Sequence, residues 1–339
     1  MNSVTESVSR GTPTGTYGAL PLAIKGAYAM FGRRLNLMFI GAGKRLSLLE
    51  RFQSAAVAEG IELGLFSIER ERRVPIAGIA QVLEGPSLDT DQSDSFLLDK
   101  LTELGIDMVI PNIDNATVAL ARLKPQIAER GAWAVVSDLK LCEDMCDKEL
   151  AEKWVRSQAI PVPDRDEFPR IVKLRNGSGA KGQHIVLDEA ELSFLAKTIN
   201  LDNYIIQTLL QGREYTVDAY VDRTGRLLGS LSRRRLVVCD GEVEVSETER
   251  HETILGLTQQ ILSYPGWEGP ITLQFIAGPH GNALIEINPR FGGGVTHSIH
   301  CGLDMPRWLI RERLGLPNEP FNDWQEGSFM TRCRRDIFL

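Results

Sequence analysis

The pattern of apolar residues changes near Ser137, and this change divides the chain into two parts that must fold differently. Before Ser137, short apolar runs typical of buried strands alternate with segments of helical periodicity. Strands that alternate with helices predict a parallel sheet with helices on both faces. The elements expected here are strands over residues 35–40, 63–68, 107–111 and 133–136, and a helix from residue 46 to about residue 59.

After Ser137 the pattern favours neighbouring strands that pair antiparallel. Residues 214–221 and 226–232 form the clearest pair, because a turn of the type Asp-Arg-Thr-Gly connects them. An α/β part should therefore be followed by an α+β part. Its remaining expected elements are helical regions over 139–158, 188–198 and 249–263, and strands over 170–174, 184–187, 204–207, 271–276 and 283–288.

The last expected strand carries unusual polar residues. Side chains alternate along a strand, so Glu286 and Asn288 point to one face while Ile285 and Ile287 point to the other. Arg290 follows one step beyond. Carboxylate and amide oxygens are ligands suited to Mg²⁺ that is also held by substrate phosphates. This segment therefore indicates an ATP-dependent enzyme.

A glycine-rich loop over residues 177–182 is a second candidate for phosphate binding. Three glycines in six residues let the backbone approach an anion closely, and Lys173 and Lys181 add positive charge. The loop is not a Walker A motif, because Gln183 and His184 follow it in place of Lys and Ser/Thr. A flexible hairpin between two strands explains the glycines equally well.

Several other polar residues share strand faces. Glu214, Thr216 and Asp218 lie on one face of their strand, and Gln274 stands between two apolar residues. A solvated face of a sheet would explain each of them alone. The run 233–235 is explained equally well as a solvated basic stretch. Alternation turns Arg234 away from its neighbours, and we select Arg235 as the residue that enters a site.

Two motifs point to other ligands. Gly41-Ala42-Gly43 after the first strand, with Glu69 after the second, is part of a dinucleotide-binding pattern, but Leu46 replaces the third glycine. A nucleotide-dependent oxidoreductase therefore stays an alternative. His297, His300 and Cys301 could suggest a metal site, although we prefer a substrate-facing loop over residues 292–304.

Composition excludes some classes of function. The 339 residues carry a net charge of -7 and no long basic stretch, so nucleic acid is not an expected partner. The sequence contains no run of about 18 apolar residues, so neither a transmembrane helix nor a membrane partner is expected. The five scattered cysteines predict reduced thiols and a cytoplasmic protein. Residues 1–34, rich in Gly, Ser and Thr, are expected to form an N-terminal arm.

Taken in chain order, these motifs resemble the ATP-grasp superfamily. The branch they resemble most contains carbamoyl phosphate synthetase, biotin carboxylase and the pyrrolysine-pathway ligases. The ordered set consists of Asp147-Lys148, Lys173 before the glycine loop, Gln207 seven residues before Glu214, Gln274, and the segment from Glu286 to Arg290. The resemblance implies a Rossmann-like αβα domain over 35–136, called the pre-ATP-grasp domain. It also implies an ATP-grasp domain over 137–339, with a lid subdomain at about 160–209 and a C-terminal antiparallel sheet.

The resemblance also implies roles for individual residues. Lys148 and Lys173 match the residues that hold ATP phosphates, and Gly177, Ser178, Gly179, Lys181 and Gly182 match the lid loop above them. Gln207, Thr208, Leu209 and Leu210 match the linker that contacts adenine, although Gln207 replaces the acid common there. Glu214 matches the ribose-binding acid, and Gln274, Glu286 and Asn288 match the magnesium ligands. Arg290, with Arg235, matches the arginines that steady phosphate and intermediate.

The implied activity is an ATP-dependent carboxylate–amine ligase that forms an acyl phosphate and releases ADP and phosphate. ATP and Mg²⁺, or Mn²⁺ in its place, are the implied cofactors. Small-molecule carboxylates and amines such as amino acids are the implied substrates, and a homodimer is the expected assembly. At this length, without biotin-carrier or glutaminase parts, we expect a stand-alone ligase. A non-catalytic ATP-binding or regulatory module is the remaining alternative.

Overall fold

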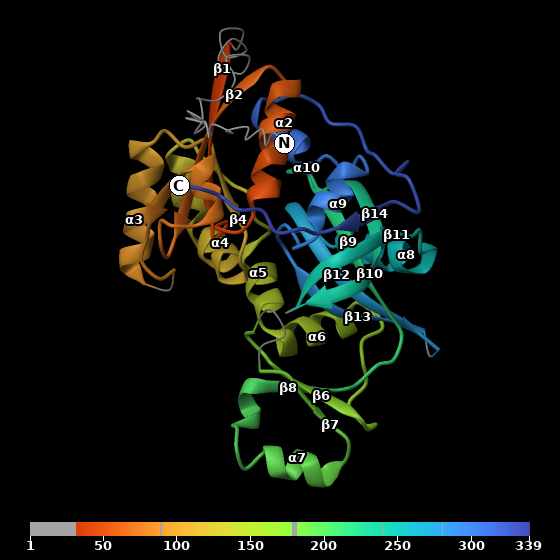
Figure 1. The fold of residues 1–339 in the computed structure, drawn as a ribbon. Helices are drawn as coiled ribbons and strands as arrows, with labels where there is room; N and C mark the ends of the chain where they lie inside the picture. Colours follow the sequence, from red (N-terminus) through yellow and green to blue (C-terminus); the bar gives the residue numbers. More distant parts are fainter. Residues whose placement is uncertain (1–31, 89, 178–181, 240, 280) are drawn as a thin grey trace, which may run out of the picture.

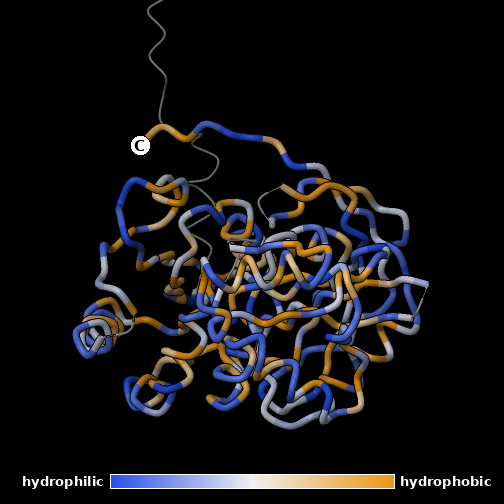
Figure 2. Tube along the Cα trace, turned by 90° about the horizontal axis from the view of Figure 1, so that it is seen from below, coloured by the Kyte–Doolittle hydropathy of each residue, from blue (hydrophilic) through white to orange (hydrophobic). Residues whose placement is uncertain are grey.

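The computed structural model describes residues 32–339 except 89, 178–181, 240 and 280. Within these residues the chain forms three sheets, and each sheet uses a different stretch of the sequence (Figure 1). Hydrophobic and hydrophilic residues alternate along the outer helices (Figure 2), as expected for helices with one face on a core. No helix of the described residues is long and apolar enough to cross a bilayer.

The first sheet is parallel, with the strand order β3-β2-β1-β4-β5. Leu37 and Phe39 of β1 pack into one core with α2, whereas Met38 and Ile40 pack into a second core with α3 and α4. The predicted parallel sheet with helices on both faces is therefore confirmed. Its elements are β1 (Arg33–Ile40), α2 (Leu46–Ala58), β2 (Ile61–Glu69), the 3₁₀ helix η2 (Pro75–Gly78), β3 (Gln81–Glu84), α3 (Asp91–Glu103), β4 (Met108–Pro111), α4 (Asp114–Glu129) and β5 (Trp133–Ala134).

The N-terminal boundary differs slightly from the prediction. Arg33 and Arg34 pair with Ile61 and Glu62 on β2, so β1 begins inside the arm predicted over residues 1–34. Residues 1–31 of that arm lie outside the described residues.

The helical region predicted over 139–158 is two helices, α5 (Leu139–Cys146) and α6 (Lys148–Ser157). Asp147 has extended backbone angles, and its carboxylate accepts hydrogen bonds from the amides of Glu149 and Leu150. Such an N-cap satisfies amides that have no partner inside the helix. The same carboxylate pairs with Arg175, whose Nη2 lies 2.6 Å from Oδ2. Asp147 therefore fixes Lys148 at the first position of α6.

The second sheet is small and projects below the rest of the molecule in Figure 1. Val172, Val186 and Leu192 form its separate core. Ser178, Gly179 and Lys181 of the predicted lid loop lie outside the described residues. The elements of this part are β6 (Arg170–Leu174), β7 (His184–Val186), α7 (Glu189–Leu195), the 3₁₀ helix η3 (Leu201–Asn203) and β8 (Tyr204–Thr208), with the strand order β7-β6-β8.

The third sheet is antiparallel, with the strand order β13-β12-β9-β10-β11-β14. The strand predicted over 226–232 continues to Cys239, because it also pairs with β11, which the sequence analysis missed. Its elements are β9 (Arg213–Val221), β10 (Leu227–Cys239), β11 (Glu242–Thr248), α8 (Glu252–Leu262), β12 (Gly269–Gly278), β13 (Gly281–Asn288) and β14 (Phe329–Thr331).

The segment 292–304 is not the loop that was predicted. It contains α9 (Val295–His300), and α10 (Met305–Arg313) follows it. Val295, Ile299 and Leu309 are buried in the same core as Leu37 and Phe52 of the first sheet and α2. This shared core holds the first and third sheets against each other, and it explains why apolar residues recur in a segment that looked like a loop.

Candidate active site

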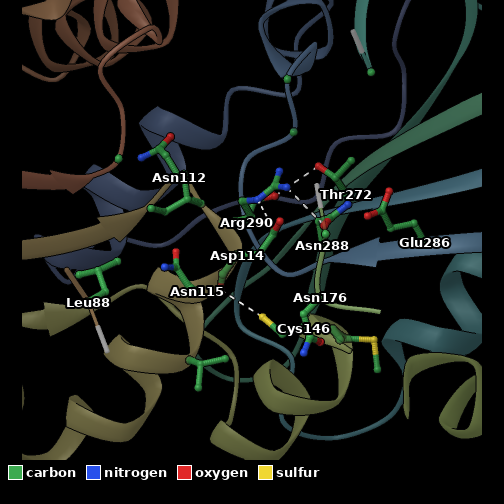
Figure 3. A pocket seen from close by; sticks show the side chains of 18 of the residues that line it. Leu88, Asn112, Asp114, Asn115, Cys146, Asn176, Thr272, Glu286, Asn288 and Arg290 are labelled. Atoms are coloured by element: carbon green, nitrogen blue, oxygen red, sulfur yellow. Dashed lines mark hydrogen bonds and ion pairs between the residues drawn. The ribbon is translucent and has the colours of Figure 1, made fainter. Parts of the chain in front are cut away.

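A cleft of about 1480 Å³ lies between the carboxyl ends of the parallel strands and the third sheet (Figure 3). Ligands of open α/β sheets bind at this edge, where the loops after the strands meet. The first sheet contributes Gly41, Arg45, Glu69, Asn112 and Asp114, the middle of the chain contributes Lys148, Asn176 and Gly177, and the third sheet contributes Thr216, Arg233, Arg235, Gln274, Glu286 and Asn288.

The residues predicted as metal ligands come together on two neighbouring strands. Gln274 on β12 lies directly opposite Glu286 on β13, and Asn288 lies two residues further along the same strand. With its amide oriented to satisfy both neighbours, Gln274 donates to Glu286 Oε2 (2.8 Å) and accepts from Arg235 Nη1 (3.2 Å). Three oxygen-bearing side chains therefore line one wall of the cleft, which is the chemistry that a hard divalent cation requires.

The predicted phosphate-binding lysines lie near Glu286 of this wall: Lys148 lines the same cleft, and the charges of Glu286 and Lys148 both act on Lys173. Nζ of Lys148 donates to the carbonyl of Gly177 (2.5 Å), whereas Nζ of Lys173 has no partner among the described residues. Burial lowers the pKa of Lys173. The positive charge of Lys148 lowers this pKa further, whereas the carboxylate of Glu286 acts to raise it. Two lysines without carboxylate partners create a positive potential that favours an anion.

A smaller cavity adjoins the cleft beside Lys148, Val155 and Ile287. Gln207 is buried there, and its Nε2 donates to Glu152 Oε2 (2.6 Å) while its Oε1 has no partner. The carboxylate of Glu152 therefore lies next to Gln207, and the sequence analysis missed this residue. Glu152 lies four residues after Lys148 on α6, and this helical spacing was the available signal.

The linker after Gln207 has part of its backbone already bonded. The amide of Thr208 donates to Asp164, and that of Leu209 donates to Pro169. The two amides therefore hold the linker in place and are not free for a ligand.

Gly182 is the last residue of the predicted lid loop and precedes β7. Its φ is 66°, a backbone conformation that glycine adopts readily.

Glu214 and Arg235 form an ion pair on the cleft-facing side of β9 and β10, with Oε1 and Nη1 2.6 Å apart. Burial lowers the pKa of Arg235, although Glu214 acts to raise it. Arg234 points to the opposite face, where it pairs with Glu247 (2.7 Å). The alternation predicted for this run of arginines is confirmed.

Asp218 is fully buried, so the explanation of this strand face as solvated is wrong for this residue. Its carboxylate accepts from Arg233 Nε (3.0 Å), Thr272 Oγ1 (3.1 Å) and Ser298 Oγ (2.7 Å). Buried charges are tolerated when they are paired and hydrogen-bonded in this way. The Asp218–Arg233 pair therefore forms the base of the cleft.

Arg290 connects the two walls of the cleft (Figure 3). Its Nε donates to Asp114 Oδ1 (2.6 Å), Nη2 donates to Asn288 Oδ1 (3.3 Å) and Nη1 donates to the carbonyl of Phe291 (3.1 Å). Although burial opposes it, the carboxylate of Asp114 raises the pKa of Arg290. The sequence analysis missed Asp114, although it follows directly after a buried strand, where functional residues of parallel sheets collect.

Comparisons with known proteins agree with this geometry. Residues 200–334 match a family described as ATP-grasp in the biosynthetic pathway with Ter operon. The chain is 26% identical over 274 residues to the carbamoyl phosphate synthase large chain of Clostridium botulinum (strain Kyoto / Type A2), which covers 69% of this chain and 26% of that protein. The chain thus spans about a quarter of the length of this curated relative.

Solved structures share the fold. The biotin carboxylase domain of 2-oxoglutarate carboxylase from Hydrogenobacter thermophilus superimposes with a TM-score of 0.69 at 18% identity, covering 86% of this chain and 73% of that one. N5-carboxyaminoimidazole synthetase from Staphylococcus aureus gives a TM-score of 0.67 at 15% identity, covering 89% and 80%. Residues 200–334 therefore match an ATP-grasp family, and the chain as a whole shares its fold with these ATP-grasp ligases. The resemblance inferred from the ordered motifs is confirmed.

The turn after β1 does not offer the diphosphate site of a dinucleotide-binding protein. The carboxylate of Glu69 accepts from Ser67 Oγ (2.6 Å) and from the backbone amides of Ala42 and Gly43. Those amides are the groups that would otherwise face a diphosphate. Glu69 therefore occupies the anion position itself, with a pKa that burial raises.

His297 and His300 are not part of a metal site in the described residues. His297 is buried and shares hydrogen bonds with Ser246 Oγ (2.8 Å) and Ser328 Oγ (3.2 Å). Burial, with the charge of Arg233, lowers its pKa to about 4. In the described part of the chain no group of three or more His, Cys, Asp or Glu residues is arranged to hold a metal ion. A divalent cation in the cleft would therefore need the amide oxygens beside Glu286.

Proposed function

We propose that this protein is an ATP-dependent carboxylate–amine ligase that acts on small molecules through an acyl phosphate and releases ADP and phosphate. One observation carries the proposal: Lys148 and Glu286 line one cleft, and the charges of both act on the buried Lys173, which like Lys148 has no carboxylate partner among the described residues. The similarity to carbamoyl phosphate synthase and to ATP-grasp synthetases supports the proposal.

The nucleotide end of the cleft, defined by Lys148, Lys173, Gln207 and Glu286, fits ATP. The unpartnered Oε1 of Gln207 is a buried acceptor suited to an amino group such as that of adenine. Thr208, Leu209 and Leu210 would flank the base, and Glu214 would bind the ribose. Lys148 and Lys173 would hold the phosphates beneath the loop that contains Gly177, Ser178, Gly179, Lys181 and Gly182.

Gln274, Glu286 and Asn288 fit Mg²⁺, with Mn²⁺ as the alternative, because they place a carboxylate and two amides on one wall. When bound, the cation would neutralise charge on the transferring phosphoryl group. The magnesium salt of ADP is present in the structure of the Hydrogenobacter biotin carboxylase domain. This supports the same pairing of nucleotide and metal in the present chain.

The proposed reaction has two steps. A carboxylate oxygen of the substrate forms a bond to the γ-phosphorus while the bond from that phosphorus to ADP breaks. The amine then forms a bond to the carbonyl carbon, and inorganic phosphate leaves. Arg290, which Asp114 orients, and Arg235 would stabilise negative charge on the phosphoryl group and on the intermediate.

The organisation of the molecule is part of the proposal. We assign residues 35–136 to a pre-ATP-grasp domain, 137–339 to the ATP-grasp domain and about 160–209 to its lid. The description of the Hydrogenobacter biotin carboxylase domain as a dimer supports a homodimer here.

The test is an ADP-release screen with hydroxylamine as the amine. Hydroxylamine converts acyl phosphates into stable hydroxamates, so the natural amine need not be known. The full chain is incubated with MgATP, hydroxylamine and each of a panel of carboxylates that includes the standard amino acids. We expect at least one carboxylate to give ADP and a hydroxamate detected by mass spectrometry. If no carboxylate raises ADP release above that of Glu286→Ala, the proposed function is wrong; MgATP binding without turnover would favour the non-catalytic module.

A further inference from the structure

The end of the cleft that lies beyond Asn288, here called the acceptor end, is built from arginines. Three of them each have a carboxylate partner within 3.0 Å. These pairs are Arg233 with Asp218, Arg290 with Asp114, and Arg332 with Glu242.

Arg45 is different, because no carboxylate of the described residues pairs with it. Its Nη2 donates to the carbonyls of Phe291 (2.9 Å) and Gly292 (2.6 Å). Its Nε and Nη1 have no hydrogen-bond partner among the described residues, and Nε is buried. Two carbonyls therefore fix the direction of the guanidinium, and part of its donor capacity is left unused.

The charge of Arg45 is correspondingly poorly compensated. Burial lowers its pKa to about 10, and the nearby charges of Arg290 and Arg332 act in the same direction. The carboxylates of Glu242 and Asp218 act to raise it, but they are paired with Arg332 and Arg233. A cation held among other cations in a partly closed cleft favours a bound anion, because that anion would replace the missing counter-charge.

Gly293 keeps the space in front of Arg45 open. A Cβ atom at this position would lie 3.7 Å from Nη1 of Arg45, with no other heavy atom within 4 Å. The neighbouring glycines differ, since a Cβ at Gly292 would lie 2.6 Å from Thr272 Oγ1 and one at Gly294 2.6 Å from Val243. Packing therefore explains Gly292 and Gly294, whereas Gly293 is explained by access to Arg45.

We propose that Arg45 and the open face at Gly293 form an oxyanion subsite that binds a carboxylate of the acceptor substrate. The existence of the subsite stands on this geometry, whereas the identity of its ligand as the acceptor rests on the proposed function. The subsite lies next to the residues that follow Arg290, because Arg45 donates to the carbonyls of Phe291 and Gly292. A nucleotide phosphate is the other possible source of an oxyanion, and the experiment separates the two.

The experiment measures thermal shifts of the full chain saturated with MgADP, at constant ionic strength, with acetate or inorganic phosphate as the probe. A ligand that binds only the folded state raises the melting temperature. Acetate should raise it for the wild type. Arg45→Met should weaken acetate binding by about 10-fold or more, because a charge-assisted hydrogen bond is lost. Arg45→Lys should show an intermediate effect.

Gly293→Ala is the second variant, because its new methyl group fits the backbone and only narrows the approach to Nη1. It should weaken acetate binding several-fold while MgADP affinity, measured by calorimetry, stays unchanged. Gly256→Ala is the matched control, since a Cβ there meets no atom within 4 Å. Arg34→Met, which removes an exposed arginine paired with Glu62, is the control for charge.

The outcomes separate the alternatives. Loss of the acetate response in Arg45→Met and its retention in Lys173→Met would support the subsite. An equal acetate response in wild type and Arg45→Met, no response in the wild type, or a loss of MgADP affinity in Arg45→Met would overturn it. If the acetate measurements support the subsite but the hydroxylamine screen detects no product, the oxyanion site would stand and the proposed ligase activity would be wrong.

Discussion

The two ends of the cleft differ in whether their cationic side chains have carboxylate partners. At the nucleotide end, Lys148 and Lys173 have no carboxylate partners among the described residues, and the carboxylate of Glu286 acts on the charge of Lys173. At the acceptor end, arginines are locked by carboxylates such as Asp114 and Asp218. A flexible ammonium without a fixed partner can follow a phosphate that enters and leaves, whereas a paired guanidinium keeps a rigid direction.

The two ends also differ in how the chain assembles them. Gln274 and Glu286 lie on neighbouring strands of one sheet. The acceptor end joins residues that are far apart in sequence, since Arg290 and Asp114 are separated by 176 positions and Arg45 and Gly292 by 247. The acceptor end should therefore depend on the contact between the first and third sheets, and the nucleotide end should not.

The largest effect should come from Glu286→Ala. Removing the one carboxylate of the proposed metal site costs several kcal/mol of transition-state stabilisation, so ADP release should fall roughly 10³-fold. Measurement of ADP release with a responding carboxylate checks this. Glu247→Ala, on the opposite face of the third sheet, should keep wild-type activity. Unchanged turnover in Glu286→Ala would contradict the assignment of this residue.

Lys173→Met tests the nucleotide end alone. The loss of a charged donor to phosphate should weaken MgADP binding by roughly 10- to 100-fold, measured by calorimetry. The free energy of unfolding of the unliganded chain should not fall, because Nζ of Lys173 has no partner among the described residues and burial penalises its charge. Lys197→Met, on an exposed part of the chain, serves as the control. If Lys173→Met binds MgADP with wild-type affinity, the assignment of Lys173 to the phosphate site is wrong.

Asp114→Asn tests the acceptor end. The variant leaves the charge of Arg290 without its carboxylate partner, which should lower the free energy of unfolding by about 1–3 kcal/mol, because the pair is only partly exposed. Turnover should fall while MgADP affinity stays near the wild-type value. A fall in MgADP affinity equal to that of Lys173→Met would show that the two ends are not separate. Urea unfolding and calorimetry supply both readouts.

The last prediction concerns the dependence of stability on pH, with no effect expected on ligand binding at neutral pH. His297 packs behind the acceptor end, and its pKa is about 4 in the folded chain against an ordinary value of 6.5. Between these values the unfolded chain binds a proton that the folded chain does not, so stability rises as the pH increases from about 4 to 6.5. The gain should be up to about 3 kcal/mol. His297→Gln should flatten this slope and His184→Gln should not; parallel curves for wild type and His297→Gln would contradict the burial argument.

The nucleotide end could be predicted from sequence because its residues follow local patterns. Alternation along β13 was enough to place Glu286 and Asn288 on one face, and alternation along β10 was enough to separate Arg234 from Arg235. The helical break at Asp147 was not predicted, because a side-chain cap and the distant Arg175 produce it.

The acceptor end could not be predicted in the same way. Arg45 was not selected as a site residue, because its partners are the carbonyls of Phe291 and Gly292, which lie 246 and 247 positions later in the sequence. The helix α9 was taken for a loop because its burial depends on α2 rather than on its own periodicity. Contacts of this kind follow from how the sheets pack, and they leave no fixed spacing in the sequence.

The most direct test of the proposed chemistry follows oxygen atoms. A responding carboxylate labelled with ¹⁸O is converted by the wild-type chain with MgATP and hydroxylamine, and the released phosphate is analysed by mass spectrometry. If the carboxylate attacks the γ-phosphate, each inorganic phosphate should carry one ¹⁸O from the substrate. Unlabelled phosphate, or ¹⁸O found in AMP, would contradict an acyl phosphate formed in this cleft.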